Sequence, residues 1–239
     1  MGFIKELTLY SEVMGQKKPV IVLEAGYGED SDTWEPVVDR LSELGEVFRY
    51  DRAGLGRSGK SENPRTSREM VKELYDLLKA AGIEPPYILV GHSFGGVNAR
   101  LYASVYPENV CGLVLVDATP VDYRERFLPV MPEEFQIAYK KQFVIEGNYE
   151  EFMESLNQVK KTEVKLDISL TVLAAGKKDH YSAGAQKLWN TLQHEMLTIS
   201  SDSRFIMAEN SGHYIHRDEP EVVVAAVREV IQRSTEENK

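Results

Sequence analysis

The sequence predicts an α/β protein with a mostly parallel central sheet flanked by helices on both faces. Two observations support this fold class. Short apolar runs typical of buried strands alternate with amphipathic helical stretches along most of the 239 residues. Hydrophobic residues make up 42% of the chain and charged residues 28%, which is enough apolar side chain for a sizeable core and too much for a disordered chain.

Each expected element follows from its own local pattern. Strands are predicted at the apolar runs 20–23, 47–50, 87–90, 113–116, 168–173 and 204–207. Helices are predicted between them at 32–44, 66–82, 94–106, 186–196 and from 218 onward. Two of these helices start at apparent capping boxes, Asp32-Thr33-Trp34-Glu35 and Thr66-Ser67-Arg68-Glu69.

The alternation of strands and helices stops between residues 119 and 167. This stretch is rich in Glu, Lys and aromatic residues, has helical spacing and contains no strand pattern. We therefore predict a helical cap at 119–167, inserted into one core that is formed by residues 1–118 and 168–239. The aromatic residues of the cap either line a binding pocket or pack against each other; they are Phe127, Phe135, Tyr139, Phe143, Tyr149 and Phe152.

Charge and cysteine content exclude several classes of function. Asp and Glu outnumber Lys and Arg by 38 to 28, so the net charge is -10 and nucleic acid is not an expected partner. The single cysteine, Cys111, excludes an internal disulfide and fits a reducing compartment. The first residues do not resemble a signal peptide, and no apolar stretch approaches the roughly 20 residues that span a bilayer. We expect a cytoplasmic protein without a membrane partner.

The most specific motif is Gly91-His92-Ser93-Phe94-Gly95, a G-x-S-x-G sequence. A predicted strand leads into the motif, and a predicted helix leaves it within one residue. This is the strand-turn-helix that holds a serine hydroxyl out of a sheet, with the helix N-terminus directed at a developing oxyanion. The motif therefore predicts Ser93 as a nucleophile.

Together with two further motifs, the chain resembles the α/β-hydrolase superfamily over nearly its whole length. One is Asp51-Arg52-Ala53-Gly54-Leu55-Gly56-Arg57-Ser58, which has the form of that family's D-x-x-G-x-G-x-S turn. The other is Gly212-His213 ahead of Glu219-Pro220, the form of its C-terminal histidine loop. The resemblance implies the α/β-hydrolase fold and a Ser–acid–His triad in this chain order.

A serine nucleophile needs a histidine base that is oriented by a carboxylate. His213 follows a glycine and matches the base of the family. The other four histidines have different expected roles: His92 in packing, His194 in solvent, His216 in structure, and His180 undecided.

Two aspartates are candidates for the acid. Asp179 comes shortly after the strand that follows the cap, which is the family's usual position, and it is the preferred candidate. Asp117, at the end of the preceding strand, is the alternative because some hydrolases place their acid there.

The oxyanion hole is expected to use the backbone N–H groups of Phe94 and Tyr27. The family usually has His-Gly before the second of these donors, whereas this chain has Ala25-Gly26 preceded by Glu24. The donor is main chain, so the departure affects the orientation of the loop rather than the presence of the N–H.

A competing pattern is present in Gly54-Leu55-Gly56-Arg57-Ser58-Gly59-Lys60-Ser61, which matches the phosphate-binding P-loop. A P-loop needs its Lys and Ser in the first turn of a helix, but Pro64 follows closely and the helix is predicted to start near Thr66. A second alternative is a small-ligand receptor on the same scaffold.

The sequence thus favours a serine hydrolase that cleaves a small carboxylic ester or a related acyl compound through an acyl-enzyme. The expected catalytic residues are Ser93, Asp179 and His213, with Tyr27 and Phe94 at the oxyanion hole. The expected partner is a small acyl substrate, and this chemistry requires no metal and no cofactor.

Overall fold

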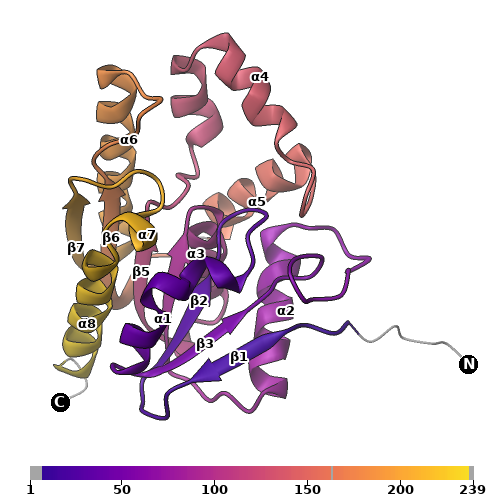
Figure 1. Cartoon of the computed structure of the whole chain (residues 1–239), viewed down its shortest axis with the longest axis vertical. Helices are drawn as coiled ribbons and strands as arrows, with labels where there is room; N and C mark the ends of the chain where they lie inside the picture. Colours follow the sequence, from indigo (N-terminus) through magenta and orange to yellow (C-terminus); the bar gives the residue numbers. More distant parts are fainter. Residues whose placement is uncertain (1–6, 163, 237–239) are drawn as a thin grey trace, which may run out of the picture.

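A computed structural model describes residues 7–162 and 164–236 and confirms the predicted fold class (Figure 1). In these residues seven strands form one sheet in the order β1-β3-β2-β4-β5-β6-β7. The pair β1–β3 is antiparallel, and all the other neighbouring strands are parallel. Helices cover both faces, as parallel strands require.

The element bounds follow the predicted order. The strands are β1 (Ser11–Met14), β2 (Val20–Glu24), β3 (Glu46–Tyr50), β4 (Tyr87–His92), β5 (Val110–Val116), β6 (Leu166–Ala175) and β7 (Ser200–Ala208). The α-helices are α1 (Glu35–Ser42), α2 (Ser67–Ala80), α3 (Phe94–Val105), α4 (Glu133–Lys141), α5 (Tyr149–Thr162), α6 (Ala183–Glu195), α7 (Ile215–Asp218) and α8 (Pro220–Glu236). Shorter helical turns are η1 (Ser31–Trp34), η2 (Pro107–Asn109), η3 (Tyr123–Phe127), η4 (Leu128–Val130) and η5 (Met196–Ile199).

Strand β1 is absent from the sequence-based expectation. Its four residues, Ser-Glu-Val-Met, contain no apolar run, and none of them is fully buried. The strand exists because it pairs with β3 at the edge of the sheet. Pairing between distant segments is a tertiary effect that local pattern does not report.

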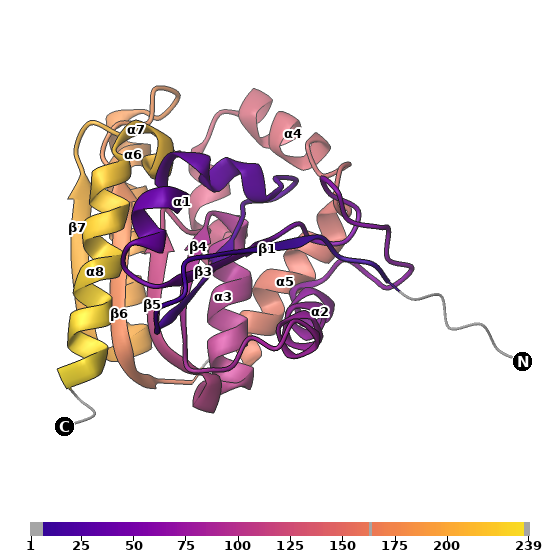
Figure 2. The same cartoon turned by 60° about the horizontal axis from the view of Figure 1, so that its bottom comes forward.

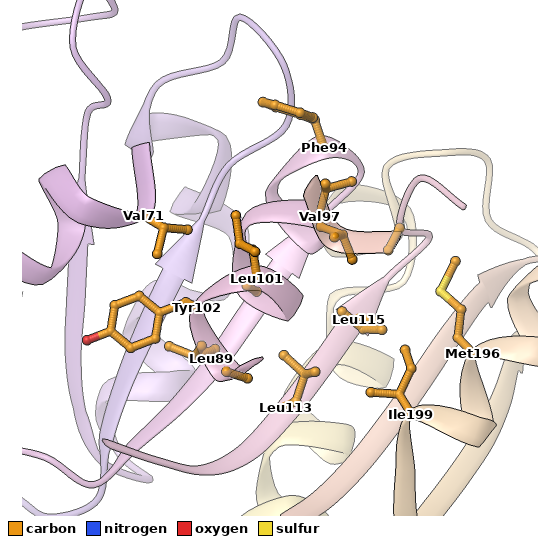
Figure 3. Packing of buried hydrophobic residues seen from close by; sticks show 14 of the residues in the cluster. Val71, Leu89, Phe94, Val97, Leu101, Tyr102, Leu113, Leu115, Met196 and Ile199 are labelled. Carbon is orange, nitrogen blue, oxygen red and sulfur yellow. The ribbon is translucent and has the colours of Figure 1, made fainter. Parts of the chain in front are cut away.

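Alternate side chains of each central strand enter two separate cores. Ile21 and Leu23 of β2 pack in a cluster with side chains of α1 and α8, whereas Val20 and Val22 pack in a cluster with side chains of α2, α3 and α6. Figure 2 shows α1 and α8 on one side of the sheet and α2, α3 and α5 on the other. Figure 3 shows the second cluster, in which Val97 of α3 and Leu115 of β5 lie between the helices and the sheet. The central strands are therefore buried on both faces.

The segment between β5 and β6 contains helices and no strand among its described residues. It comprises η3, η4, α4 and α5, and α5 contacts both α2 and α3 (Figure 1). The segment 119–167, expected as the cap, enters β6 at Leu166. We refer to residues 119–165 as the cap segment.

The two expected capping boxes form differently from the prediction. Asp30, rather than Asp32, caps the first helical turn, which is a 3-10 turn that precedes α1. Thr66 stands at the N-cap of α2, but its side chain makes no capping bond. Ser155 and Gln158 of α5 instead accept hydrogen bonds from the first amides of α2. Tertiary contacts therefore replace the local cap.

In the described part of the chain, no helix is both long and apolar enough to cross a membrane. Lys60 and Ser61 lie in the loop ahead of α2 and outside its first turn. They lack the helix N-terminus on which a P-loop depends.

Candidate active site

Five loops meet at the carboxyl end of the sheet, where α/β proteins bind their ligands. The turn after β2 contains Tyr27, and β4 ends in the turn of Ser93. Asp117 follows β5, Lys178 follows β6, and His213 follows β7. Segments far apart in sequence therefore bring these side chains to one place.

Ser93 occupies a strained turn between β4 and α3. Its φ of 52° is positive, and residues other than glycine rarely adopt a positive φ. A Cβ on Gly91 would come within 2.6 Å of the Gly95 carbonyl oxygen, and a Cβ on Gly95 within 2.1 Å of the Glu24 carbonyl oxygen. Both glycines are therefore required by the close approach of strand and helix, as in a nucleophile elbow.

His213 extends from a buried carboxylate to the cavity. Its Nδ1 lies 2.6 Å from Asp117 Oδ2, while 34% of its side chain is exposed. Since a carboxylate only accepts hydrogen bonds, Nδ1 carries the proton and donates it to Asp117, which leaves Nε2 as the basic nitrogen. Ser93 and His213 line the same cavity.

The expectation that Asp179 orients His213 is wrong. Asp179 is exposed in the turn after β6, and the carboxylate that bonds His213 belongs to Asp117. Asp117 directly follows the buried strand β5 and has a φ of 43°. Asp117 and Ser93 are the two non-glycine residues with positive φ in the described chain. The strained backbone turns the carboxylate of Asp117 toward the histidine loop.

Four donors surround the buried carboxylate of Asp117. The Ala175 amide and Trp189 Nε1 donate to Oδ1 at 3.1 and 2.6 Å, and His213 and Lys178 donate to Oδ2, both at 2.6 Å. Burial alone would raise the pKa of Asp117, but the Lys178 charge and the hydrogen bond from His213 outweigh it and lower the pKa. Asp117 is therefore held as a carboxylate.

The turn after β2 leaves one amide without an acceptor. The Gly26 N–H donates to Glu29, and the Gly28 N–H donates to Glu146. Between them, the N–H of Tyr27 has no acceptor among the described residues, and neither does the N–H of Phe94 at the start of α3. The two expected oxyanion donors are thus amides without an acceptor, in residues that line the same cavity as Ser93.

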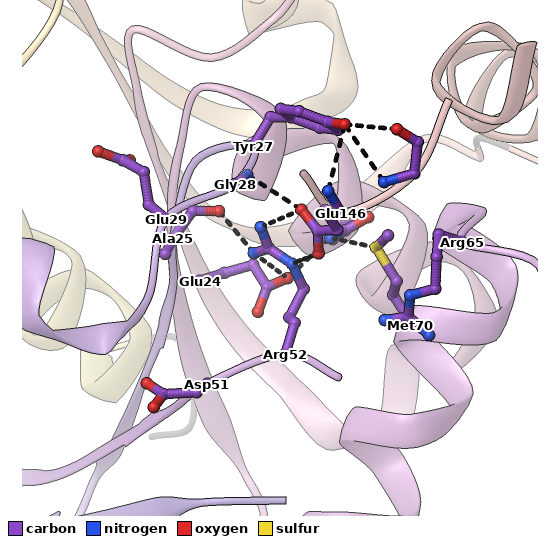
Figure 4. Close-up of polar contacts among 12 residues, drawn as sticks. Glu24, Ala25, Tyr27, Gly28, Glu29, Asp51, Arg52, Arg65, Met70 and Glu146 are labelled. Carbon is purple, nitrogen blue, oxygen red and sulfur yellow. Dashed lines mark hydrogen bonds and ion pairs between the residues drawn. The ribbon is translucent and has the colours of Figure 1, made fainter. Parts of the chain in front are cut away.

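A buried arginine sets the orientation of this turn (Figure 4). Arg52 donates to the carbonyl oxygens of Ala25 and Gly26 at 2.7 and 2.6 Å. It also forms a two-pronged ion pair with Glu146 of the cap segment, at 2.5 and 2.9 Å, and reaches Glu24 at 3.4 Å. This chain lacks the usual His-Gly before Tyr27, and Arg52 holds the backbone of the turn instead.

The cap segment adds a second link to the same turn. The Tyr27 hydroxyl donates to the Gly147 carbonyl oxygen at 2.6 Å, and its ring packs edge-on against Phe143 with the centroids 4.9 Å apart. We call Arg52, Glu146 and Tyr27, with their mutual contacts, the turn clamp. It ties the cap segment to the turn that contains Tyr27.

The other four histidines lie as follows. His92 is buried, and its Nε2 bonds the His213 carbonyl oxygen while its Nδ1 faces Glu29, each at 3.1 Å. His216 is buried and bonds Thr33, as expected for a structural role. His194 is exposed on α6, and His180 is exposed at the rim of the cavity.

A cavity of about 430 Å³ opens above Ser93 and His213. This volume suits a small organic ligand. Four of the six aromatic cap residues line it, namely Phe135, Tyr139, Phe143 and Phe152, whereas Phe127 is fully buried in packing. Within the described ranges, no group of three or more His, Cys, Asp or Glu side chains is arranged to hold a metal ion.

Sequence reasoning missed Arg52, Glu146, Lys178 and Trp189. Arg52 lies inside the D-x-x-G-x-G-x-S turn, directly after a buried strand, and its position was a usable signal. The other three contact the site from distant segments, and no local spacing relates them to Ser93.

The chain belongs to the alpha/beta hydrolase fold family, which it matches over residues 19–148. It is 39% identical over 217 residues to the uncharacterized protein YqjL of Bacillus subtilis (strain 168), a match that covers 90% of this chain and 85% of that protein. Among solved structures, it is similar to alpha/beta hydrolase domain-containing protein 10 from mouse, with a TM-score of 0.74, 19% identity and coverage of 98% and 97% of the two chains. It is also similar to a thermophilic esterase from Thermogutta terrifontis, with a TM-score of 0.69, 20% identity and coverage of 98% and 96%. These comparisons support a hydrolytic enzyme.

Proposed function

We propose that the protein is a serine hydrolase that cleaves a small carboxylic ester, or a related acyl compound such as a lactone, through an acyl-enzyme. The observation that carries the proposal is the hydrogen bond between buried Asp117 and His213, which lines one aromatic cavity together with Ser93. The esterase of similar fold agrees with this chemistry.

The reaction follows from the roles of these side chains. His213 Nε2 takes the proton from Ser93 Oγ as the oxygen attacks the substrate carbonyl, and Asp117 stabilises the imidazolium that results. The N–H groups of Tyr27 and Phe94 donate to the tetrahedral oxyanion. Collapse of this intermediate expels the alcohol, which receives the proton from His213. Water, deprotonated by the same histidine, then releases the carboxylic acid from Ser93.

The cavity volume sets an expectation for the substrate. A space of about 430 Å³ with aromatic walls holds a short acyl chain or an aryl group more readily than a long lipid chain. We propose that short-chain aryl esters are better substrates than long-chain ones. We also propose a cytoplasmic location, because the lone Cys111 is a half-buried thiol whose pKa is raised by burial and suits a reducing compartment.

The test compares the wild type with Ser93→Ala on a panel of p-nitrophenyl esters, lactones and amides, together with a fluorophosphonate probe. We expect Ser93→Ala to lose probe labelling and to lower turnover by a factor on the order of 10⁶. Equal labelling of the two proteins would contradict the proposal. Ligand binding without turnover would instead support a receptor, and stabilisation by ATP would favour the P-loop alternative.

A further inference from the structure

A lysine shares the carboxylate oxygen that orients the candidate base. Lys178 Nζ lies 2.6 Å from Asp117 Oδ2, the same atom that accepts the hydrogen bond from His213. The lysine side chain is 7% exposed, and Nζ stands 3.5 Å from the ring centroid of Trp189. Burial lowers the pKa of Lys178, and the charge and hydrogen bond of Asp117 oppose that effect. The carboxylate and the indole face are the two contacts that favour the ammonium form.

Trp189 fixes which oxygen the cation meets. Its Nε1 donates to Oδ1 of Asp117 at 2.6 Å, and the Ala175 amide donates to the same oxygen. The other oxygen, Oδ2, is left to His213 and Lys178 together. Each carboxylate oxygen has two lone pairs, so both donors are accommodated, but they share a single negative charge.

The shared charge changes what Asp117 does for His213. A carboxylate beside an imidazole normally favours the protonated ring. Here a cation neutralises that carboxylate at hydrogen-bond distance, so the imidazolium gains less from it. Burial and the Lys178 charge together lower the pKa of His213 to about 4, against the opposing effect of Asp117.

The remaining groups around His213 do not supply a compensating negative charge at hydrogen-bond distance from the ring. His92 packs against the ring with its centroid 4.7 Å away, and Tyr214 lies at 5.5 Å. Glu29 and His216 contact His92, and the Glu29 carboxylate is bonded to His92, Gly26 and Arg217. The balance at His213 therefore depends mainly on Asp117 and Lys178.

We propose that Lys178 is a positioning residue that keeps His213 unprotonated, and the hydrolase active, in acidic solution by neutralising the shared oxygen of Asp117. The loop after β6, where an acid was expected, thus contributes a cation to the catalytic pair. This inference rests on the proposed function of Ser93 and His213.

The test is the pH profile of kcat/KM for two variants, Lys178→Met and Lys178→Gln. Methionine removes the charge and the donor, whereas glutamine keeps a donor and removes only the charge. If the acid limb of the wild-type profile lies near pH 4, the wild type at pH 5 retains most of its plateau kcat/KM. If the limb of the variants moves to pH 6 or above, their rates at pH 5 fall about tenfold below their own plateaus.

Lys187→Met on α6 is the matched control, since Lys187 is exposed and lies outside the cavity. It removes the same charge and is expected to keep the wild-type limb. An acid limb that stays within about 0.3 units of the wild type in both Lys178 variants would overturn the inference.

A direct titration separates this inference from the proposed function. The ring of His213 is followed by NMR in the wild type and in each Lys178 variant, with the signal assigned by its loss in His213→Gln. We expect the variants to titrate at least one unit above the wild type, whether or not an ester is hydrolysed. An unchanged titration in folded variants refutes the role of Lys178 while leaving Ser93 untouched. If Ser93 of the wild type does not react with the fluorophosphonate probe, the proposed function is refuted, and the titration still tests the role of Lys178.

Discussion

At the residue scale, the four donors to Asp117 give its two carboxylate oxygens different roles. Oδ1 is held by Trp189 and the Ala175 amide, and Oδ2 is left for His213 and Lys178. A carboxylate fixed in this way can hold only one tautomer of His213, the one with its basic nitrogen away from Asp117. The same pairing makes the site sensitive to a change at Asp117 alone, since Lys178 would then be buried without its counter-charge.

Asp117→Asn tests this assignment. The amide keeps the shape of the side chain but removes the charge that stabilises the imidazolium, so kcat is expected to fall by about 10³–10⁴. Asp179→Asn is expected to keep most of the activity, because that carboxylate is exposed and does not bond His213. Steady-state kinetics of the two variants decide between the aspartates, and a larger loss in Asp179→Asn would reverse the assignment.

The Asp117→Asn variant needs a control for folding. Leaving a buried lysine unpaired is expected to destabilise the protein by about 3–5 kcal/mol. The double variant Asp117→Asn/Lys178→Met removes both charges and should recover much of that stability without recovering kcat. Thermal unfolding and kinetics of the single and double variants therefore separate the structural effect from the catalytic one.

At the scale of elements, the turn after β2 is held from two sides. Arg52, two residues after the end of β3, donates to the carbonyl oxygens of the turn, and Glu146 of the cap segment accepts from both Arg52 and the Gly28 amide. The Arg52–Glu146 ion pair of the turn clamp is buried, so it is screened little by solvent. The position of the cap segment and the direction of the Tyr27 amide are consequently coupled.

Glu146→Gln is expected to loosen this coupling. Glutamine can accept one hydrogen bond from Arg52 or Gly28 but cannot form the two-pronged ion pair. Because the Tyr27 amide is then less well directed, we expect kcat to fall by about ten- to a hundredfold, less than the 10²–10³ typical of a lost oxyanion donor. Glu150→Gln on the exposed face of α5 serves as the control for charge. An unchanged kcat in Glu146→Gln would show that the turn keeps its direction without the clamp.

At the scale of the whole molecule, the sheet divides the protein into two cores, and the site lies across its carboxyl edge. Titratable groups buried at that edge make folding depend on pH. Burial, together with nearby positive charge, lowers the pKa of His216 to about 2 and that of His213 to about 4. Both histidines are therefore neutral in the folded protein where the unfolded chain would protonate them.

Stability is thus expected to fall as the pH drops below about 6.5, since the two histidines then bind protons in the unfolded chain but stay neutral in the folded protein. For fully buried His216 the loss reaches about 2 kcal/mol by pH 5, or several degrees in Tm. Calorimetry between pH 7 and 5 measures the decline. His216→Phe should show a smaller decline than the wild type. A Tm that stays constant over this range would contradict the account.

Much of the fold could be predicted because its signals are local. The apolar runs of β2, β4 and β5 and the G-x-S-x-G turn each lie within a few residues, so the sequence predicted the strands, their alternation with helices and the tight strand-to-helix turn at Ser93. Edge strand β1 and the capping of α2 escaped prediction, because their hydrogen bonds involve β3 and α5. The start of α2 near Thr66 was predicted correctly.

The sequence by itself determined the class of fold, the nucleophile elbow and the histidine loop, since short-range sterics and hydrophobic periodicity act along the chain. The tertiary structure alone decided which carboxylate meets His213. Asp117 and Asp179 both follow strands. In the folded chain, Asp117 has a strained backbone and a buried carboxylate, whereas in the loop after β6 it is Lys178, not Asp179, that is buried. The tertiary structure also decided how the turn after β2 is held, because Arg52 and Glu146 are 94 residues apart and meet only in the folded chain.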